Sequence, residues 1–207
     1  MNKAPFLAIS RHRLAIDGQG VTTLVAFHGC PLHCRYCLND MCHNPDRVWK
    51  ELTPEELVEI VSIDNLYFLA TQGGVTFGGG EPSLWSLFIE EFASIMDSRW
   101  RITMETSLHV PRSHLERLLP VVNQWIVDVK TMDADIYKQY TGCDNTLMTD
   151  NLGFLLSHEG MAEKVVTRLP LIPEYNTPDD VAKSRALLEE MGVKHFDEFE
   201  YMVNRKG

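Results

Sequence analysis

Short runs rich in β-branched and aromatic residues alternate along this sequence with windows of helical periodicity. The runs predict six strands, each next to a helical window, over residues 21–28, 74–78, 101–105, 125–129, 164–169 and 195–201. Consecutive strand-helix-strand units are right-handed and build a parallel sheet. The alternation therefore predicts an α/β fold with an all-parallel sheet and, in 207 residues, one domain.

Three helix starts are predicted from capping sequences. Thr53 precedes a proline and stands three residues before Glu56, which is the pattern of a capping box. Ser113 and Thr177 begin similar segments. We expect each of these three residues to lie just outside a helix and to accept a hydrogen bond from its first turn.

The composition limits the partners of the chain. Acidic residues exceed basic residues by 29 to 19, so the surface field repels nucleic acid and anionic membranes. The longest apolar stretches, such as residues 121–129, are shorter than the ~20 residues that cross a bilayer. The N-terminal residues lack the features of a secretory signal. We expect a cytoplasmic protein whose partner is another protein or a small molecule, with no membrane or nucleic-acid partner.

Polar and glycine-rich motifs follow the ends of the predicted strands. In a parallel α/β sheet the ligand binds at the carboxyl ends of the strands, so motifs on different strands converge there. In strand order the motifs are the cysteines after residue 29, residues 78–82, residues 105–107, Asp128 with Lys130, and Arg168. The order of the motifs predicts one site assembled from five strand ends.

Three of the five cysteines lie within eight residues, at Cys30, Cys34 and Cys37. This spacing does not suit a disulfide framework, whereas thiolates bind both iron-sulfur clusters and zinc. Structural zinc takes four ligands, and the residues available to complete such a set are His28, His33 and Cys42. Spacing alone leaves both metals open. If Cys42 is not a zinc ligand, we expect it to be an ordinary small apolar residue, and we expect the same of Cys143.

The segments around the cysteines resemble a known family. Residues 17–20, DGQG, and 27–39, FHGCPLHCRYCLN, are similar to the N-terminal signature of the glycyl radical enzyme activating enzymes. This is the family of pyruvate formate-lyase activating enzyme, within the radical S-adenosylmethionine (SAM) superfamily. Four further segments resemble later motifs of the family and occur in the same order. They are GGVTFGGGEP at 73–82, ETS at 105–107, DVKTMD at 128–133 and RLPLIP at 168–173. The resemblance covers the chain from about residue 9 to residue 201.

The resemblance implies a fold and two cofactors. The fold is a partial (β/α)6 TIM-like barrel of the radical SAM type, with residues 1–207 as a single core domain. The cofactors are S-adenosylmethionine and a [4Fe-4S] cluster with one iron left open to chelate it. The residues that would hold the other three irons are Cys30, Cys34 and Cys37.

The resemblance also assigns residues to the parts of S-adenosylmethionine. The loop against the methionyl part is Gly78, Gly79, Gly80 and Glu81, and Lys130 offsets the carboxylate charge. The nucleoside part is assigned to Asp128 for the ribose hydroxyls, Tyr36 and Asn39 beside the adenine, and Arg168 near the ribose or Asp128. A monovalent cation site is implied at Glu105, Thr106 and Asp128.

The implied reaction needs two protein partners. A flavodoxin or ferredoxin reduces the cluster, and cleavage of S-adenosylmethionine gives methionine and a 5′-deoxyadenosyl radical. That radical abstracts a hydrogen atom from a glycine of a glycyl radical enzyme. Such chemistry demands no general acid or base, and we assign no catalytic residue of that kind.

Two departures from the family pattern and two alternatives stand beside this interpretation. Glu105 takes a position where aspartate is commoner, and Met202 takes the place of a histidine that contacts the cofactor in many relatives. One alternative is a radical SAM enzyme that modifies another peptide or a small metabolite. The other is an electron-transfer or zinc-binding module that never cleaves S-adenosylmethionine.

Overall fold

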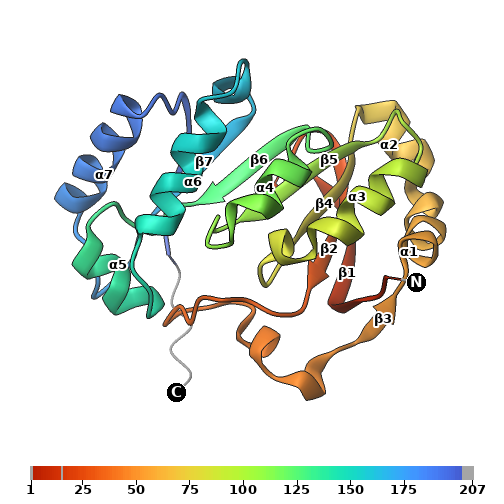
Figure 1. Ribbon diagram of the computed structural model, residues 1–207, viewed down its shortest axis with the longest axis horizontal. Helices are drawn as coiled ribbons and strands as arrows, with labels where there is room; N and C mark the ends of the chain where they lie inside the picture. Colours follow the sequence, from red (N-terminus) through yellow and green to blue (C-terminus); the bar gives the residue numbers. More distant parts are fainter. Residues whose placement is uncertain (1, 15, 202–207) are drawn as a thin grey trace. The chain divides into compact units, whose positions relative to one another are not determined.

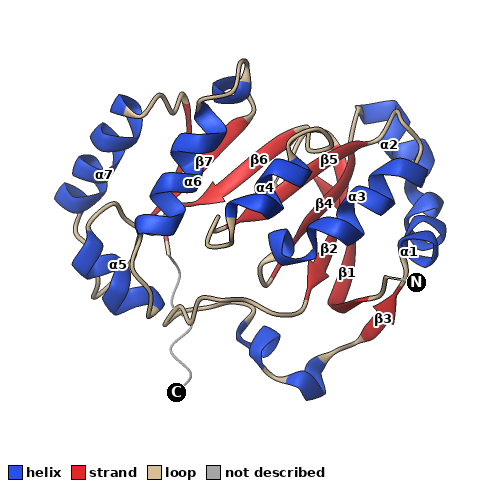
Figure 2. Ribbon diagram, in the orientation of Figure 1, coloured by secondary structure: helices blue, strands red, loops and turns tan. Residues whose placement is uncertain are grey.

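The strands of the chain form an open sheet, which Figure 1 traces in sequence order and Figure 2 shows with its helices. In the computed structural model, which describes residues 2–14 and 16–201, eight strands pair in the order β3-β1-β2-β4-β5-β6-β7-β8. Within the described residues the two end strands of this order do not pair with each other. The predicted α/β fold with a partial barrel is therefore confirmed.

Contacts group the described residues into two compact units. The first unit comprises the described residues up to Pro31, then Asn39–Thr106 and Val110–Ile126. The second comprises Leu32–Leu38, Ser107–His109 and the described residues from Val127 onward. The prediction of a single domain over residues 1–207 stays a prediction, and each unit is described in turn.

The first unit contains the N-terminal strands of the sheet. These are β1 (Ala4–Leu14), β2 (Val21–Phe27), β3 (Lys50–Leu52), β4 (Gly74–Gly79) and β5 (Arg101–Thr106). β2 pairs with β4, and β4 with β5, in parallel, as predicted. β1 pairs with both β2 and β3 antiparallel, so the prediction of an all-parallel sheet is wrong at this edge. The connection from β1 to β2 is too short for the crossover that a parallel pair needs.

The helices of the first unit are α1 (Pro54–Val61), α2 (Asn65–Thr71), α3 (Ser86–Ile95) and α4 (Arg112–Leu118). The predicted capping box at Thr53 is confirmed, because its hydroxyl accepts from the Glu56 amide and the Glu56 carboxylate accepts from the Thr53 amide. The prediction for Ser113 is wrong. α4 begins at Arg112, two residues before the predicted start, so Ser113 already lies in the first turn.

An aromatic core joins α3 to the strands of the first unit. Phe27 of β2 lies 5.6 Å from Phe77 of β4 and 5.8 Å from Phe88 of α3, between ring centroids. Phe77 also lies 5.3 Å from Phe92 of α3. All four side chains are fully buried, and each contributes on the order of 2 kcal/mol through burial. This packing fixes β2 and β4, whose ends lead into the motifs.

The second unit contains the C-terminal strands and helices. They are β7 (Val165–Leu171), β8 (His195–Glu200), α5 (Ala134–Thr141), α6 (Thr146–Leu156) and α7 (Pro178–Glu190), while β6 (Gln124–Asp128) includes residues of both units. β7 and β8 pair in parallel. The predicted cap at Thr177 is confirmed, with Asp180 as the third residue of a capping box. None of the helices in the described part of the chain is long and apolar enough to cross a membrane.

Candidate active site

The glycine motif of the first unit is attached to the end of β2 through its backbone. Phe27 and Gly79 are paired at the ends of β2 and β4. Beyond them the Gly80 amide donates to the Phe27 carbonyl at 2.9 Å, and the Glu81 amide donates to the Gly29 carbonyl at 2.7 Å. The chain leaving β2 toward Cys30 therefore runs beside the glycine motif.

Gly80 is required by a close approach of main-chain atoms, whereas Gly78 faces the end of a side chain. A Cβ on Gly80 would lie 2.2 Å from the Gly29 carbonyl oxygen, closer than any side chain tolerates. A Cβ on Gly78 would lie 2.6 Å from Oε2 of Glu105, so the carboxylate of Glu105 occupies the space that a side chain would take. Gly80 thus meets a structural demand in addition to any contact with a ligand, because the main chain at Gly29 cannot move aside as a side chain can.

Asn39 also belongs to this side of the first unit. Its Nδ2 donates to the Gly79 carbonyl at 2.9 Å, and its own carbonyl accepts from the Cys42 amide at 2.8 Å. The Cys42 carbonyl accepts in turn from the Gly29 amide at 3.0 Å. The Cys42 side chain is buried against Leu7 and Ala26, as expected of a small apolar residue. These bonds tie the segment after the cysteines to both glycine-containing strand ends.

A buried polar cluster links Glu81 to the end of β5. Glu81 is only 1% exposed, and its Oε1 accepts from the Thr106 hydroxyl at 2.7 Å and from the Ser83 amide at 3.1 Å. The hydroxyls of Ser83 and Thr106 lie 3.0 Å apart. Two residues predicted for the site, Glu81 and Thr106, are therefore in direct contact. Ser83, which the sequence analysis did not single out, completes the cluster.

The second unit holds Cys34 and Cys37 on a segment that we call the cysteine loop, Leu32–Leu38. Its backbone is bonded to the last turn of α5, because the His33 amide donates to the Thr141 carbonyl at 2.9 Å and the Arg35 amide to the Tyr140 carbonyl at 3.0 Å. Within the loop the Cys37 amide donates to the Cys34 carbonyl at 3.2 Å. The loop is thus a turn between two half-buried cysteines.

Tyr36, at the centre of the cysteine loop, lies in a group of aromatic side chains. Its ring meets those of Tyr140 and Tyr175 edge to face, with centroids 6.1 and 5.7 Å away. Its hydroxyl donates to Oε2 of Glu174 at 3.0 Å, and its carbonyl accepts from the Tyr201 hydroxyl at 2.8 Å. Both ends of Tyr36 are therefore held, by residues that the sequence analysis did not connect with the loop.

Asp128 and Lys130, predicted for the site, form an ion pair at the end of β6. Nζ of Lys130 lies 3.5 Å from Oδ2 of Asp128, and the two side chains are 11% and 32% exposed. Burial opposes the charge on Lys130, but Asp128 and Cys34 outweigh this and raise its pKa. The second unit therefore keeps a positive charge in a nearly buried position.

Cys34 interacts electrostatically with this lysine. Burial raises the pKa of the Cys34 thiol to about 11, and Lys130 is the main influence in the opposite direction. A thiol with such a pKa carries its proton at neutral pH and loses it when a metal binds. Cys34 is thus suited to a metal rather than to acting as a free nucleophile.

Arg168 lies within β7 rather than at its end, which corrects the prediction. β8 pairs with β7 as far as Leu171, so the strand continues three residues beyond Arg168. Nε of Arg168 donates to Oδ2 of Asp197, its neighbour on β8, at 3.3 Å. The Arg168 carbonyl accepts from the Val129 amide at 3.0 Å, between Asp128 and Lys130. The backbone of Arg168 therefore supports the segment that carries the ion pair.

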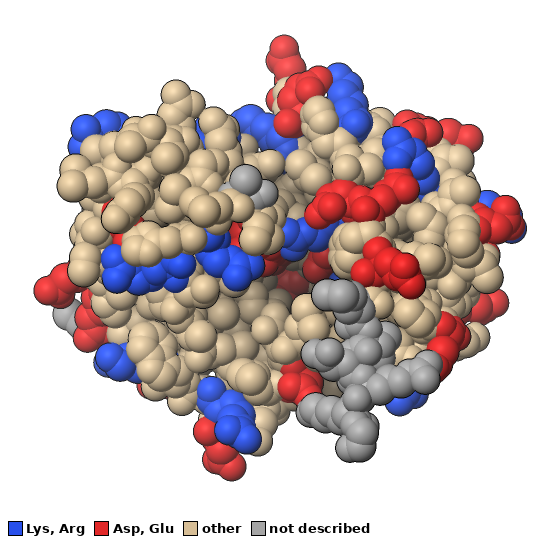
Figure 3. All heavy atoms as spheres, turned by 180° about the vertical axis from the view of Figure 1, so that it is seen from behind, with Lys and Arg blue, Asp and Glu red and all other residues tan. Residues whose placement is uncertain are grey.

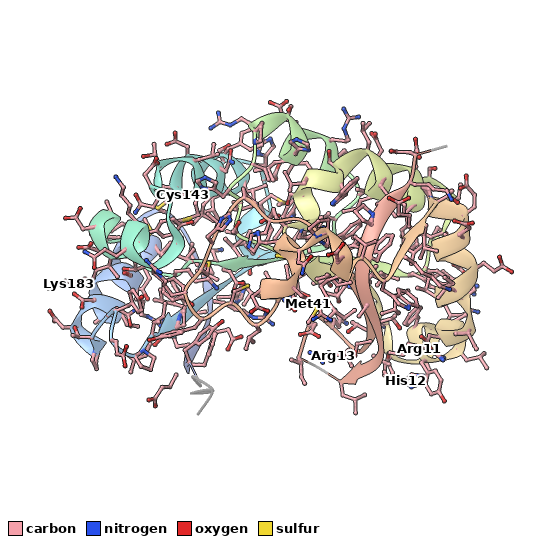
Figure 4. The ribbon with its side chains drawn as sticks, turned by 90° about the horizontal axis from the view of Figure 1, so that it is seen from below. Arg11, His12, Arg13, Met41, Cys143 and Lys183 are labelled. Atoms are coloured by element: carbon pink, nitrogen blue, oxygen red, sulfur yellow. The ribbon has the colours of Figure 1, made fainter. Side chains whose placement is uncertain are left out.

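The donors of the cysteine motif suit a cluster by their chemistry. Among the residues that the structure describes, no three His, Cys, Asp or Glu side chains are grouped as a single metal ion requires. A four-iron cluster makes a different demand, because each iron that the protein holds takes one thiolate. Cys143, the fifth cysteine, follows α5 (Figure 4) and is half-buried. The roles predicted for the site residues in binding the cofactors stay predictions. Met202 lies outside the described residues.

The fold and the cysteine motif can now be compared with known proteins. Residues 24–188, most of the chain, match the family model described as the Radical SAM superfamily. The chain therefore belongs to the radical SAM superfamily.

Curated proteins similar to this chain include activating enzymes. The pyruvate formate-lyase-activating enzyme of Staphylococcus aureus (strain USA300) is 31% identical over 201 residues, which cover 90% of this chain and 76% of that protein. The (2S)-3-sulfopropanediol dehydratase activating enzyme of Klebsiella oxytoca is 32% identical over 170 residues, 78% of this chain. The chain belongs to this family of activating enzymes, although it matches only about half, 52%, of the Klebsiella protein.

A solved structure agrees with the fold. SuiB of Streptococcus suis superimposes with a TM-score of 0.65 at 14% identity, over 86% of this chain and 39% of that chain. At this level of identity the likeness concerns the fold alone.

Proposed function

We propose that this chain reductively cleaves S-adenosylmethionine at a [4Fe-4S] cluster and abstracts a hydrogen atom from a glycine of a partner glycyl radical enzyme. The observation that carries the proposal is the cysteine motif that follows β2, with three thiols at the spacing of the family. The names of the similar activating enzymes support the choice of partner.

Cys30, Cys34 and Cys37 would hold the cluster. When bound, the cluster would supply one electron to S-adenosylmethionine, whose cleavage gives methionine and a 5′-deoxyadenosyl radical. Lys130 favours ligation by Cys34, because its positive charge lowers the pKa of a thiol that burial otherwise keeps protonated. Thiolates are soft ligands that suit an iron-sulfur cluster, and the nearly buried charge of Lys130 favours the thiolate form of Cys34.

In the second unit, Lys130 and Asp128 would bind opposite kinds of group. The ammonium of Lys130 suits the carboxylate of the methionyl part, and the Asp128 carboxylate accepts from ribose hydroxyls. Tyr36 presents an aromatic ring for the adenine, and Arg168 supports the strand that carries the ion pair. Because Lys130 is nearly buried, its attraction for a carboxylate is screened less than at an exposed site.

In the first unit, Gly78, Gly79, Gly80 and Glu81 would border the methionyl part, with Asn39 bonded to Gly79. The backbone around Gly80 approaches Gly29 too closely for any side chain, which leaves main-chain groups as the lining of this loop. Thr106, in contact with Glu81, and Glu105, over Gly78, would contribute with Asp128 to a monovalent cation site.

The proposal includes partners and a location. A flavodoxin or ferredoxin would reduce the cluster, and the reaction would take place in the cytoplasm without a membrane or nucleic acid. Lys and Arg side chains and Asp and Glu side chains occur together on the face seen in Figure 3, while the whole chain carries a net charge of −10. This excess of acid supports a protein partner over a polyanion.

The test of the first step is anaerobic reconstitution with iron and sulfide, followed by dithionite and S-adenosylmethionine. The proposal predicts release of 5′-deoxyadenosine and methionine in equal amounts, measured by chromatography. A protein that carries a full cluster and releases neither product is an electron-transfer module, and the proposal is then wrong.

The second step is tested with partner enzymes. Incubation of the reduced protein and S-adenosylmethionine with glycyl radical enzymes should give the doublet of a glycyl radical in electron paramagnetic resonance. Cleavage of S-adenosylmethionine with no doublet from any of these partners would favour the alternative, a radical SAM enzyme that acts on another peptide or a small metabolite.

A further inference from the structure

Tyr201 contacts the cysteine loop at the peptide unit next to Cys37. The carbonyl that accepts from its hydroxyl, at 2.8 Å, belongs to Tyr36 and therefore to the peptide unit that joins Tyr36 to Cys37. The amide of the same peptide unit donates to the Cys34 carbonyl at 3.2 Å. Because a peptide unit is planar, bonds at both of its ends fix its plane and with it the direction of the N–Cα bond of Cys37.

The backbone of Tyr201 is itself anchored. Its amide donates to the Leu171 carbonyl at 2.8 Å, directly beyond the parallel pairing of β7 with β8. The side chain is half-buried. The phenol thus reaches the loop from a backbone that the sheet holds in place.

The charge state of Tyr201 favours a lasting bond. Burial raises the pKa of its hydroxyl, with Lys130 and Tyr140 acting in the opposite direction. The hydroxyl therefore keeps its proton at neutral pH and remains a donor.

We propose that Tyr201 is a positioning residue of the cysteine loop, which orients Cys37 by donating a hydrogen bond to the Tyr36 carbonyl. The role in cluster binding rests on the proposed function, while the orientation of Cys37 does not. Residues that hold a metal ligand in place typically account for a 10- to 100-fold effect on metal affinity.

The variant Tyr201→Phe removes the hydroxyl and keeps the ring. Tyr175→Phe is the matched control, because Tyr175 contacts Tyr36 and Tyr140 through its ring, at 5.7 and 5.1 Å, and also loses only a hydroxyl. Both variants are first compared with the unmodified chain by circular dichroism and thermal unfolding.

The first measurement is the rate at which an iron chelator removes iron from the reconstituted, unreduced protein without oxygen. Tyr201→Phe should lose iron about 10-fold faster than the unmodified chain. Tyr175→Phe should lose it at the unmodified rate. Equal rates for all three proteins would overturn the proposal.

The second measurement uses metal-free protein and so separates this proposal from the function. Alkylation of each cysteine is followed by mass spectrometry of its peptide, with Cys143 as the internal reference. Tyr201→Phe should change the rate at Cys37 by about 3-fold or more relative to Cys143, since a loosened peptide exposes the thiol differently. If the unmodified chain takes up no cluster, the proposed function fails, and an unchanged rate at Cys37 additionally rejects the role of Tyr201.

Amide exchange in the unmodified chain covers the case in which Tyr201→Phe does not fold. The Cys37 amide, bonded to Cys34 on a peptide held by Tyr201, should exchange at least about 10-fold more slowly than an unstructured peptide. Exchange at the unstructured rate would contradict the proposal.

Discussion

The two units hold their predicted site residues in different ways. In the first unit the glycine motif is held by main-chain bonds from Gly80 to Phe27 and from Glu81 to Gly29. In the second unit the cysteine loop is bonded to α5 through its backbone, but Tyr36 at its centre is held by the side chains of Glu174 and Tyr201.

This difference predicts how the residues of each unit respond to substitution. Where main-chain atoms meet, an added methyl group has nowhere to go, so the effect is steric and large. Where hydroxyls and charges hold a loop, removal of one group leaves the fold intact and changes the chemistry of the loop. Variants in the two units should therefore separate stability from cofactor binding.

The largest effect is expected for Gly80→Ala. Its Cβ would meet the Gly29 carbonyl oxygen at 2.2 Å, and the variant should lose about 3 kcal/mol or more of unfolding free energy in urea titrations. Gly153→Ala is the control, because this exposed position in α6 has no atom within 4 Å of the added methyl. It should gain about 0.5 kcal/mol or more. Equal stability of the Gly80 variant and the unmodified chain would refute the main-chain account.

A smaller loss is expected for Asp64→Asn, which tests a side-chain anchor of the first unit away from the glycine motif. The buried Asp64 carboxylate accepts from Arg11 and from the Thr23 hydroxyl, and its Oδ1 lies 3.0 Å from Nε2 of His12 (Figure 4 labels Arg11 and His12). The Asp64 side chain is fully buried, whereas its partner Arg11 is 38% exposed. The variant should therefore lose about 2 kcal/mol of unfolding free energy at pH 7.

The loss should depend on pH. Burial opposes ionisation, but the bonds from Arg11 and Thr23 prevail and lower the pKa of Asp64 below its ordinary value of 3.8. A carboxylate whose pKa is lowered by folding stabilises the folded state at pH values above its ordinary pKa. This contribution disappears as the pH falls through the pKa of the folded state. The difference in unfolding free energy between the two proteins should therefore shrink below about pH 4. A difference that stays constant from pH 7 to pH 3 would show that the carboxylate charge has no part in it.

Ser83→Ala should have a still smaller effect. It removes a hydroxyl 3.0 Å from Thr106 but leaves the bond from Thr106 to Glu81, so the expected loss is about 1 kcal/mol in the same titrations. The control is Ser94→Ala on the exposed surface of α3, which should change the unfolding free energy by less than about 0.5 kcal/mol. A larger loss at Ser94 than at Ser83 would argue against the buried cluster.

The sequence predicted the parts of this site whose signals are local. Capping at Thr53 and Thr177, the ends of β2 and β4, and the small apolar character of Cys42 follow from neighbouring residues. β1 was not predicted, and its antiparallel pairing with β2 follows from the short turn between them. The start of α4 was predicted too late, because the helix begins directly after Pro111 and not after Ser113.

Two contacts between distant residues were not predicted. Ser83 meets Thr106 across 23 positions, and Tyr201 meets Tyr36 across 165. Neither residue belongs to a short pattern with its partner, so only the folded chain brings their hydroxyls to these acceptors. The sequence therefore indicated the chemistry of the site, and the fold added the residues that position it.

The central claim of the proposed function is that Cys30, Cys34 and Cys37 hold a cluster at which S-adenosylmethionine is cleaved. Cys34→Ala and Cys143→Ala, each reconstituted without oxygen, test it through iron and sulfide content and through release of 5′-deoxyadenosine after dithionite. Cys34→Ala should lose both the brown iron-sulfur chromophore and the cleavage product, while Cys143→Ala should keep both. Cleavage by Cys34→Ala at the rate of the unmodified chain would contradict the account.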